Sequence, residues 1–307
     1  MPASTREIQR RTHAIQNIEQ ITHAMQMVAA SRMRRAQQAA LRTRVYAEKA
    51  LEILINVSVV AQEELHPLLQ KRDRKRSHLL ILSADRGLCG GLNLAIFQKA
   101  QEFIHHLQVE HQEEVLVSVW GKKARDLLNR SGVPIYTDYS NVFEPASFSE
   151  VRPVVENFLR EFLEQKYERA YLIYPHFVST LSQKVVVKRV IPLGRDSLNL
   201  LVKAEIKIKL AELYEEPLLD YLFEPNPRVV LNYLLPKLIE SQFYQAVLET
   251  RASEHSARMV AMKNATEAAT EIIDELTLTY NRARQANITQ EMAEILGGAE
   301  ALKNNSL

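Results

Sequence analysis

Apolar and small residues recur at spacings of three, four or seven positions, the last being one three plus one four, along the first part of the chain. The repeat runs through Ile8, Ile15, Ile18, Thr22, Met25, Ala29 and Ala36. This spacing is typical of a helix that packs along one seam. Neither Gly nor Pro interrupts the chain between Ser4 and Glu64, and Glu7 follows Ser4 at the spacing of a capping box. The pattern therefore predicts an N-terminal coiled-coil helix over residues 1–66.

A second seam of the same kind occupies the last part of the chain. Its members are Met262, Ala265, Ala269, Ile272, Leu276, Thr279, Ala283, Ala286, Gln290 and Ala293. The gaps alternate between three and four residues, as in a heptad repeat. Pro227 suits the first turn of a helix, and no Gly follows it until Gly297. The segment 228–307 is predicted to hold a helix to about residue 296, roughly 100 Å long at 1.5 Å per residue.

The composition of the two seams indicates how they are used. Both are rich in Ala and Thr, so a partner must approach closely, and each seam offers such a partner to the other. We expect the two terminal helices to form an antiparallel coiled coil. Because the C-terminal helix is the longer one, one of its ends should project alone unless another protein surrounds it.

The middle of the chain has a different pattern, in which short apolar runs alternate with amphipathic segments. Strands are predicted at 78–83, 114–119, 133–136, 170–174 and 184–192, and helices at 92–109, 122–130 and 149–166. Alternating strands and helices are typical of an α/β sheet. We expect an α/β domain over 77–195, joined to the last helix by a connecting segment at 196–227.

Composition narrows the class of protein. The chain has 307 residues, is 46% hydrophobic and carries a formal charge of +2, which argues against disorder. Its longest apolar run, 53–61, is too short to span a bilayer, so direct membrane insertion is not expected. A single cysteine, Cys89, excludes an intrachain disulfide and a multi-cysteine metal site.

The charge is distributed unevenly along the chain. Residues 1–49 hold nine basic and three acidic residues. The arginine cluster in this part consists of Arg32, Arg34, Arg35, Arg42 and Arg44. Such a cluster can bind nucleic acid. Only Tyr46 supplies an aromatic ring nearby, so pairing with acidic loops of a protein partner is the favoured interpretation.

The sequence offers little that points to catalysis. A glycine-rich segment, 87–91, follows a predicted strand and precedes a helix, as phosphate-binding loops do, but it matches neither common phosphate-binding motif. A tight turn explains it better. No histidine is placed with Cys89, and the nine histidines lack the spacing of metal ligands. We expect no enzyme active site, no cofactor and no metal.

Four segments resemble the signature segments of the gamma subunit of F-type ATP synthases. They are ITHAMQMVAAS at 21–31, DRGLCGGLN at 85–93, ARMVAMKNAT at 257–266 and YNRARQANITQE at 280–291. The resemblance covers the whole chain in the family's order. It implies two long terminal helices in an antiparallel coiled coil, and a Rossmann-like central domain that binds no nucleotide.

The resemblance also implies a function. In this family the chain is the non-catalytic rotor shaft of a proton-translocating ATP synthase, in which rotation of a membrane ring of c subunits drives conformational cycling of the catalytic beta subunits. The implied partners are the alpha and beta subunits, the epsilon subunit and the c-subunit ring. The implied location is the cytoplasmic side of a bacterial plasma membrane, as a peripheral protein.

The residues that match the family's contact positions fall into three groups. Met25 matches a position near an acidic lever of the beta subunit, and Arg258 matches a position that influences coupling. Arg284 and Gln285 match positions that meet beta loops at the upper shaft, and Ile288, Thr289 and Glu294 continue that surface. Tyr221, Phe223 and Glu224 match the foot on the c ring, near epsilon.

Some features depart from the family's pattern. Gln20 and His23 stand where Lys is common, which lowers the positive charge opposite the beta subunits. No cysteine-flanked insert occurs in 196–215, so a thiol switch is not expected. The absence of a transit peptide favours a bacterial source. The alternative from another class is a helical nucleic-acid-binding protein.

Overall fold

The computed structural model describes residues 5–60, 66–70, 72–73, 75–140, 148–193, 224 and 226–304. For 44–60, 227–228 and 300–304 it describes the backbone alone. The chain divides into two compact units. We call 1–29 with 259–307 the helical unit, and 30–258 the α/β unit. Helices α1 (Thr5–Val60) and α7 (Pro227–Asn304) each contribute to both units.

The α/β unit is built on one mixed sheet. Its strands are β1 (Arg76–Leu82), β2 (Glu114–Trp120), β3 (Thr137–Asp138), β4 (Arg169–Phe177) and β5 (Gln183–Ile191). They lie in the order β3-β2-β1-β4-β5, and all neighbours are parallel except β4 and β5. The helices between them are α2 (Leu92–His105), which continues as the π-helical turn η2 (His106–Glu110), α3 (Lys122–Ser131) and α4 (Phe148–Leu163).

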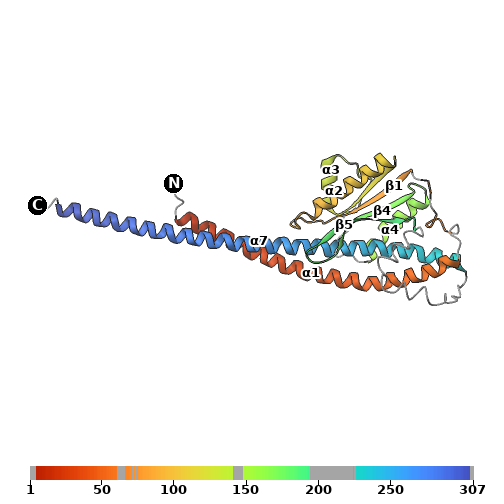
Figure 1. The fold of residues 1–307 in the computed structure, drawn as a ribbon, viewed down its shortest axis with the longest axis horizontal. Helices are drawn as coiled ribbons and strands as arrows, with labels where there is room; N and C mark the ends of the chain where they lie inside the picture. The colour runs from red at the N-terminus through yellow and green to blue at the C-terminus, as the bar shows by residue number, and fades with distance from the viewer. Residues whose placement is uncertain are drawn as a thin grey trace. The chain divides into compact units, whose positions relative to one another are not determined.

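Helices cover both faces of this sheet. Successive side chains of a strand point to opposite faces. In Figure 1, α2 and α3 lie on one side of the sheet, and α4 and α7 lie on the other. Leu79 and Ile81 of β1 accordingly belong to the core with α2 and α3, whereas Leu80 and Leu82 belong to the core with α4 and α7. The α/β unit therefore has three layers, with an apolar core on each side of the sheet, as the alternating pattern of the sequence predicts.

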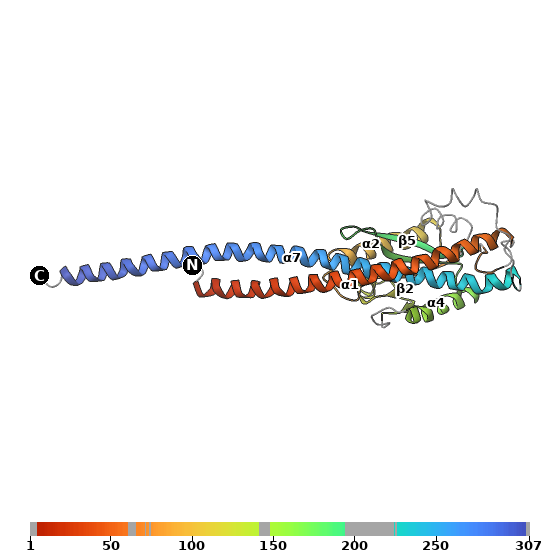
Figure 2. The ribbon, with the colours of Figure 1, turned by 90° about the horizontal axis from the view of Figure 1, so that it is seen from below.

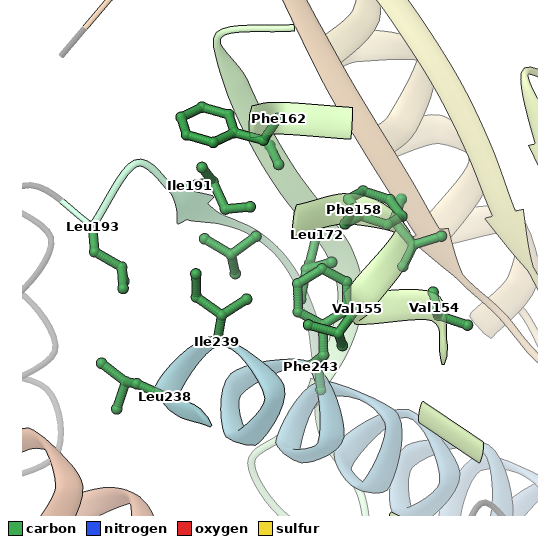
Figure 3. Packing of buried hydrophobic residues seen from close by; sticks show 14 of the residues in the cluster. Val154, Val155, Phe158, Phe162, Leu172, Ile191, Leu193, Leu238, Ile239 and Phe243 are labelled. Carbon is green, nitrogen blue, oxygen red and sulfur yellow. The ribbon is translucent and has the colours of Figure 1, made fainter. Parts of the chain in front are cut away.

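The core between the sheet, α4 and α7 is the larger of the two. Figure 3 shows Phe158 of α4, Leu172 of β4 and Phe243 of α7 converging in it. All three side chains are buried. Burying a side chain of this size stabilises a fold by about 1.5–3 kcal/mol relative to exposure. The first turns of α7 are thus held in the α/β unit by apolar packing.

The helical unit is an antiparallel pair of helices. The hydroxyls of Thr22 in α1 and Thr266 in α7 are 2.8 Å apart, and Thr270 donates a hydrogen bond of 3.2 Å to Glu19. Residue numbers fall along one helix as they rise along the other, so the helices run in opposite directions. Buried Ala269 shows that the contact uses small side chains, as the seam composition predicts.

Among the described residues of the helical unit, no partner helix lies along the far end of α7. Figures 1 and 2 show α7 continuing past the N-terminal end of α1. Every side chain from 284 to 299 is exposed. This agrees with the expectation that one end of the longer helix projects. Among the helices of the described residues, none is both long and apolar enough to cross a membrane.

The predicted third strand at 133–136 is wrong. Gly132 ends α3 in the left-handed conformation, with φ of 74°. Pro134 follows and has no N–H for a ladder, so pairing cannot begin there. The amide of Tyr136 donates the first hydrogen bond to Val117 of β2, and β3 itself comprises only Thr137–Asp138.

The predicted seams are displaced by one residue at several positions. Ile272 and Thr279 are exposed, whereas Ile273 and Tyr280 are half-buried. Ile18 of α1, also a predicted seam member, is 47% exposed. The hydrogen-bonded threonine pair lies one position further along α7 than the predicted line, and the contact follows it. Predicted seam members beyond Ala283 lie on the exposed end of the helix.

Gly121 occupies a position that no other residue fits. Its φ is +122°, and a Cβ built on it would lie 2.3 Å from the carbonyl oxygen of Ser83. The close approach allows the Ser83 hydroxyl to accept a hydrogen bond from the Ala124 amide and Asp85 to accept one from Lys122. Both bonds satisfy amides in the first turn of α3. The loop after β1 is thus attached to the start of α3.

We predict that Gly121→Ala destabilises the chain by more than about 2 kcal/mol, because a strained backbone and a clash with backbone atoms add together. Gly91→Ala is the matched control, since Gly91 has φ of −83° and nothing lies near its added Cβ. Urea unfolding of the two variants measures the difference. Equal stability of Gly121→Ala and Gly91→Ala would contradict the clash.

His78 is a buried histidine in the core beneath α4. Its Nε2 lies 2.8 Å from the hydroxyl of Ser118, and its ring stacks on Phe158 with centroids 4.1 Å apart. Burial lowers the pKa of His78 from 6.5 to about 3. The imidazole is therefore neutral at physiological pH, and its 3.7 Å approach to Glu161 is not an ion pair.

This histidine should make stability depend on pH. Below pH 6.5 the unfolded chain binds a proton that the folded chain does not bind until about pH 3. Stability should therefore fall with decreasing pH across this window, by about 1.4 kcal/mol per pH unit for this one proton. In His78→Gln the slope of unfolding free energy against pH should be smaller by that amount between pH 6 and pH 4. Identical slopes would show that His78 does not titrate as its burial requires.

Candidate functional site

The loop after β1, residues 83–91, is an ordered turn at the carboxyl end of the strand. Leu88 and Gly90 adopt positive φ angles of 61° and 58°. Asn93 holds the turn from α2, because its side chain accepts a 3.2 Å hydrogen bond from the Ala84 amide and donates one of 3.1 Å to Cys89 Sγ. The asparagine and the glycines of this segment thus serve the geometry of the turn.

Arg258 of α7 binds this turn from the other side. Its guanidinium donates to the carbonyl of Gly87 at 3.2 Å and to that of Arg86 at 3.4 Å, and it forms a 2.7 Å ion pair with Glu254. Arg258 is only 8% exposed. Two segments that are 171 residues apart in the sequence are therefore joined by one buried cation.

The polarity of the turn decides between the two interpretations of its glycines. A phosphate-binding loop directs backbone N–H groups toward the anion. Here carbonyl oxygens of Arg86 and Gly87 converge on a cation instead. This arrangement supports the tight turn. Cys89 is buried, and burial raises the pKa of its thiol, so the thiol is protonated at neutral pH.

The exposed end of α7 carries five of the predicted contact residues. Arg284 and Gln285 are exposed, and Ile288 is 49% exposed. The Thr289 hydroxyl donates to the Gln285 carbonyl at 2.9 Å, and Glu294 accepts a hydrogen bond from Gln290 at 2.9 Å. The structure therefore places this group together on one bare stretch of helix, with mixed polar and apolar side chains.

Comparison with known proteins gives the family of this chain. A sequence model of the family described as ATP synthase matches residues 4–302. The ATP synthase gamma chain of Pelotomaculum thermopropionicum is 39% identical over 300 residues, which cover 98% of this chain and 99% of that protein. The gamma chain of Chloroflexus aurantiacus is 39% identical over 305 residues, 98% of this chain and 99% of its own length.

The chain belongs to the ATP synthase gamma chain family.

Solved structures agree on the fold. The central stalk of the Tetrahymena thermophila mitochondrial ATP synthase matches with a TM-score of 0.57 and 23% identity, over 80% of this chain and 99% of that chain. A chain of the Euglena gracilis mitochondrial ATP synthase matches with a TM-score of 0.63 and 19% identity, over 97% of this chain and 94% of that chain. At these identities the likeness concerns the fold alone.

The remaining contact positions suggested by the gamma chain family lie apart from the exposed end of α7. Met25 is half-buried in the helical unit, three residues after Thr22. Since Thr22 faces Thr266, Met25 and Arg284 are separated by about twenty residues of α7, or roughly 30 Å. Glu224 is exposed. Tyr221 and Phe223 lie outside the described residues.

Arg258, which the family resemblance suggested as a contact position, faces the interior of the α/β unit in this structure. All the hydrogen bonds given above for its guanidinium go to groups of its own chain. The sequence suggested the position from the resemblance, but it carried no signal for this orientation.

Sequence reasoning missed one set of residues in this gamma chain. Ser253 and Ser256 of α7 are both fully buried and donate hydrogen bonds to the sheet and to the hairpin that follows β4. In the sequence they belong to a polar stretch, 249–258, which reads as a solvated helix face. The only available signal was that this stretch directly follows a strongly apolar one.

We predict that Arg258→Gln destabilises the chain by about 3–5 kcal/mol, because it leaves the carboxylate of Glu254, whose side chain is 3% exposed, buried without its cation. The double variant Glu254→Gln with Arg258→Gln removes both charges and should recover most of that loss. Urea unfolding measures stability, and the rate of thiol labelling at Cys89 reports opening of the turn. A loss below about 1 kcal/mol in Arg258→Gln would refute the buried pair.

Proposed function

We propose that this gamma chain is the central rotor shaft of a proton-translocating F-type ATP synthase. It couples the rotation of a membrane ring to conformational cycling of catalytic subunits. The observation that carries the proposal is the exposed stretch 284–299 of α7 in a member of the gamma chain family. A helix end that exposes Ile288, Met292 and Ile295 needs surrounding protein.

The partners follow from the family. The solved Tetrahymena structure is described as a central stalk with a c ring, and the one from Euglena as a rotational state of an ATP synthase. For this chain we infer contacts with alpha and beta subunits around the exposed end of α7, and with the epsilon subunit and the c-subunit ring near Glu224. ATP chemistry then belongs to the partners, and this chain is non-catalytic.

Asymmetry gives the shaft its mechanism. A ring of three equivalent catalytic subunits surrounding one antiparallel helix pair meets a different face of the pair at each position. A contact that is stronger in one orientation stabilises one conformation of the facing subunit. Rotation then changes which subunit is stabilised, and by linkage the state of the subunits changes the favoured angle of the shaft.

The location follows from this role. A shaft seated on a membrane ring is a peripheral protein, and we propose the cytoplasmic side of a bacterial plasma membrane. The alternative of a nucleic-acid-binding protein has no observation in its favour. Arg34 and Arg35 are exposed. The family's sequence model nevertheless matches residues 4–302, and the relatives are ATP synthase gamma chains.

Recovery of the chain from native membranes tests the proposal. A tagged copy should co-purify with ATPase activity and with alpha, beta, epsilon and c subunits in mass spectrometry. A copy truncated after residue 283 is the control, because it lacks the bare stretch and should lose the alpha and beta subunits first. Recovery of nucleic acid in place of these subunits would contradict the proposal.

Met25→Lys should weaken coupling more than assembly. Met25 is half-buried in the helical unit, so a longer cationic side chain must extend outward from the pair. There it can pair with an acidic group of the catalytic subunits in only some rotary positions. An ion pair of about 1.4 kcal/mol that forms in one state alone changes a rate tenfold.

Reconstituted vesicles measure this effect as the ratio of proton pumping to ATP hydrolysis, alongside subunit recovery. Met25→Leu, which keeps the size and adds no charge, is the matched control. Arg284→Ala and Gln285→Ala should lower the same ratio from the opposite helix, by removing contacts on the exposed end of α7. If a fully assembled Met25→Lys complex keeps the wild-type ratio of pumping to hydrolysis, the proposed role of Met25 in coupling is wrong.

A further inference from the structure

The stretch 249–258 of α7 is polar and yet buried. Its buried polar members are Thr250, Ser253, Glu254, His255, Ser256 and Arg258. Directly before it, residues 231–247 of the same helix supply apolar side chains to the core of the α/β unit. The face of α7 toward the sheet therefore changes from apolar to hydrogen-bonding within one turn.

Three side chains of this stretch contact β4 and the hairpin after it. Ser253 donates a 2.9 Å hydrogen bond to the carbonyl of Pro175, and Ser256 donates one of 2.6 Å to that of Thr180. Glu249 lies 2.6 Å from Nδ1 of His176. We call Glu249, Ser253 and Ser256 the polar seam. Together with Arg258 on the turn after β1, it joins α7 to two separate loops of the sheet.

Simple packing does not explain two fully buried serines. Alanine would fit the same space and is a better helix former than serine. A buried hydroxyl is costly unless it is hydrogen-bonded, and then its net contribution to stability is only about 1 kcal/mol. What the serines add beyond alanine is direction, because a hydrogen bond weakens steeply when its angle changes.

Direction matters when a helix carries a load about its own axis. The hydrophobic effect that buries side chains such as Phe243 and Ile239 is non-directional and depends on the area removed from water, so it does not by itself set an angle between the sheet and α7. Hydrogen bonds from one helix face to fixed carbonyls oppose such a rotation. In a shaft that transmits torque between a ring and a catalytic head, this rotation is the one that the load produces.

We propose that the polar seam is a torque-bearing joint, in which Ser253 and Ser256 act as positioning residues that fix the rotational angle of the sheet about α7. The inference rests on the proposed function, since only a rotor loads the joint in this way. It gives the serines a role in coupling efficiency that their contribution to stability does not predict.

The test uses the assembled ATP synthase with its alpha and beta head immobilised. A rod is attached to the α/β unit through Leu94→Cys, an exposed position on α2, while buried Cys89 stays unlabelled. With the rotor stalled, the variance of the rod's angle reports torsional compliance. Ser253→Ala with Ser256→Ala removes two of the four polar side chains that join α7 to β4, to the hairpin after it and to the turn after β1. We expect the variance to rise by up to about 2-fold, the value reached when these polar contacts carry the whole torsional stiffness in equal parts.

Thr250→Val is the matched control. Thr250 is also a buried hydroxyl of this stretch, but it donates to Ala246 of its own helix. We expect its variance to equal that of the unaltered chain. Each single serine variant should raise the variance less than the double variant does. If the double variant fails to assemble, the single variants are measured in its place.

Three outcomes overturn the joint. The first is an unchanged variance in assembled serine variants, and the second is an equal rise in Thr250→Val. The third is loss of assembly in both single serine variants, which would show that the serines are needed for folding and not for the angle between the sheet and α7. Failure of the proposed function looks different, because the rod on the unaltered chain would then not turn when ATP is supplied.

Discussion

The whole structure depends on one constraint, which is that a single helix, α7, serves both compact units. An isolated helix in water is marginal, so each stretch of α7 needs something to stabilise it. Apolar packing holds residues 231–247, and hydrogen bonds to loops of the sheet hold residues 249–258. Contact with α1 holds the stretch that follows, through pairs such as Thr22 with Thr266. Beyond residue 283, every described side chain up to residue 299 is exposed, so none of these three kinds of contact is found there.

The three kinds of contact suit different demands. The apolar core anchors α7 in the α/β unit with most of the available free energy. The polar contacts add angular precision, and the small residues of the helical unit let two helices approach closely with little buried area. An interface of Ala and Thr stabilises weakly, so we expect the exposed end of α7 to be fully ordered only inside a surrounding partner. A shaft that turns inside a ring needs such a slender end.

Much of this fold could be predicted from the sequence, because long uninterrupted heptad spacing is specific to packed helices and alternating apolar runs are typical of a covered sheet. The errors have local causes. Gly132 and Pro134 delay the start of the third strand to residue 137. In the helical unit, Thr22 faces Thr266 and not the predicted Ala265. The polar seam could not be predicted, because serines on a helix look solvated until their acceptors are known. The family resemblance suggested Arg258 as a functional position. Only its contacts with Glu254 and Gly87 show that its side chain faces inward.

The central claim is that this chain turns as a unit inside a catalytic head, and direct observation of rotation tests it. A rod attached through Glu224→Cys, at an exposed position, reports the angle of the chain when the alpha and beta head is fixed to a surface. The account predicts unidirectional rotation when ATP is supplied, and none in its absence. A rod that stays still while the same complexes hydrolyse ATP would contradict it.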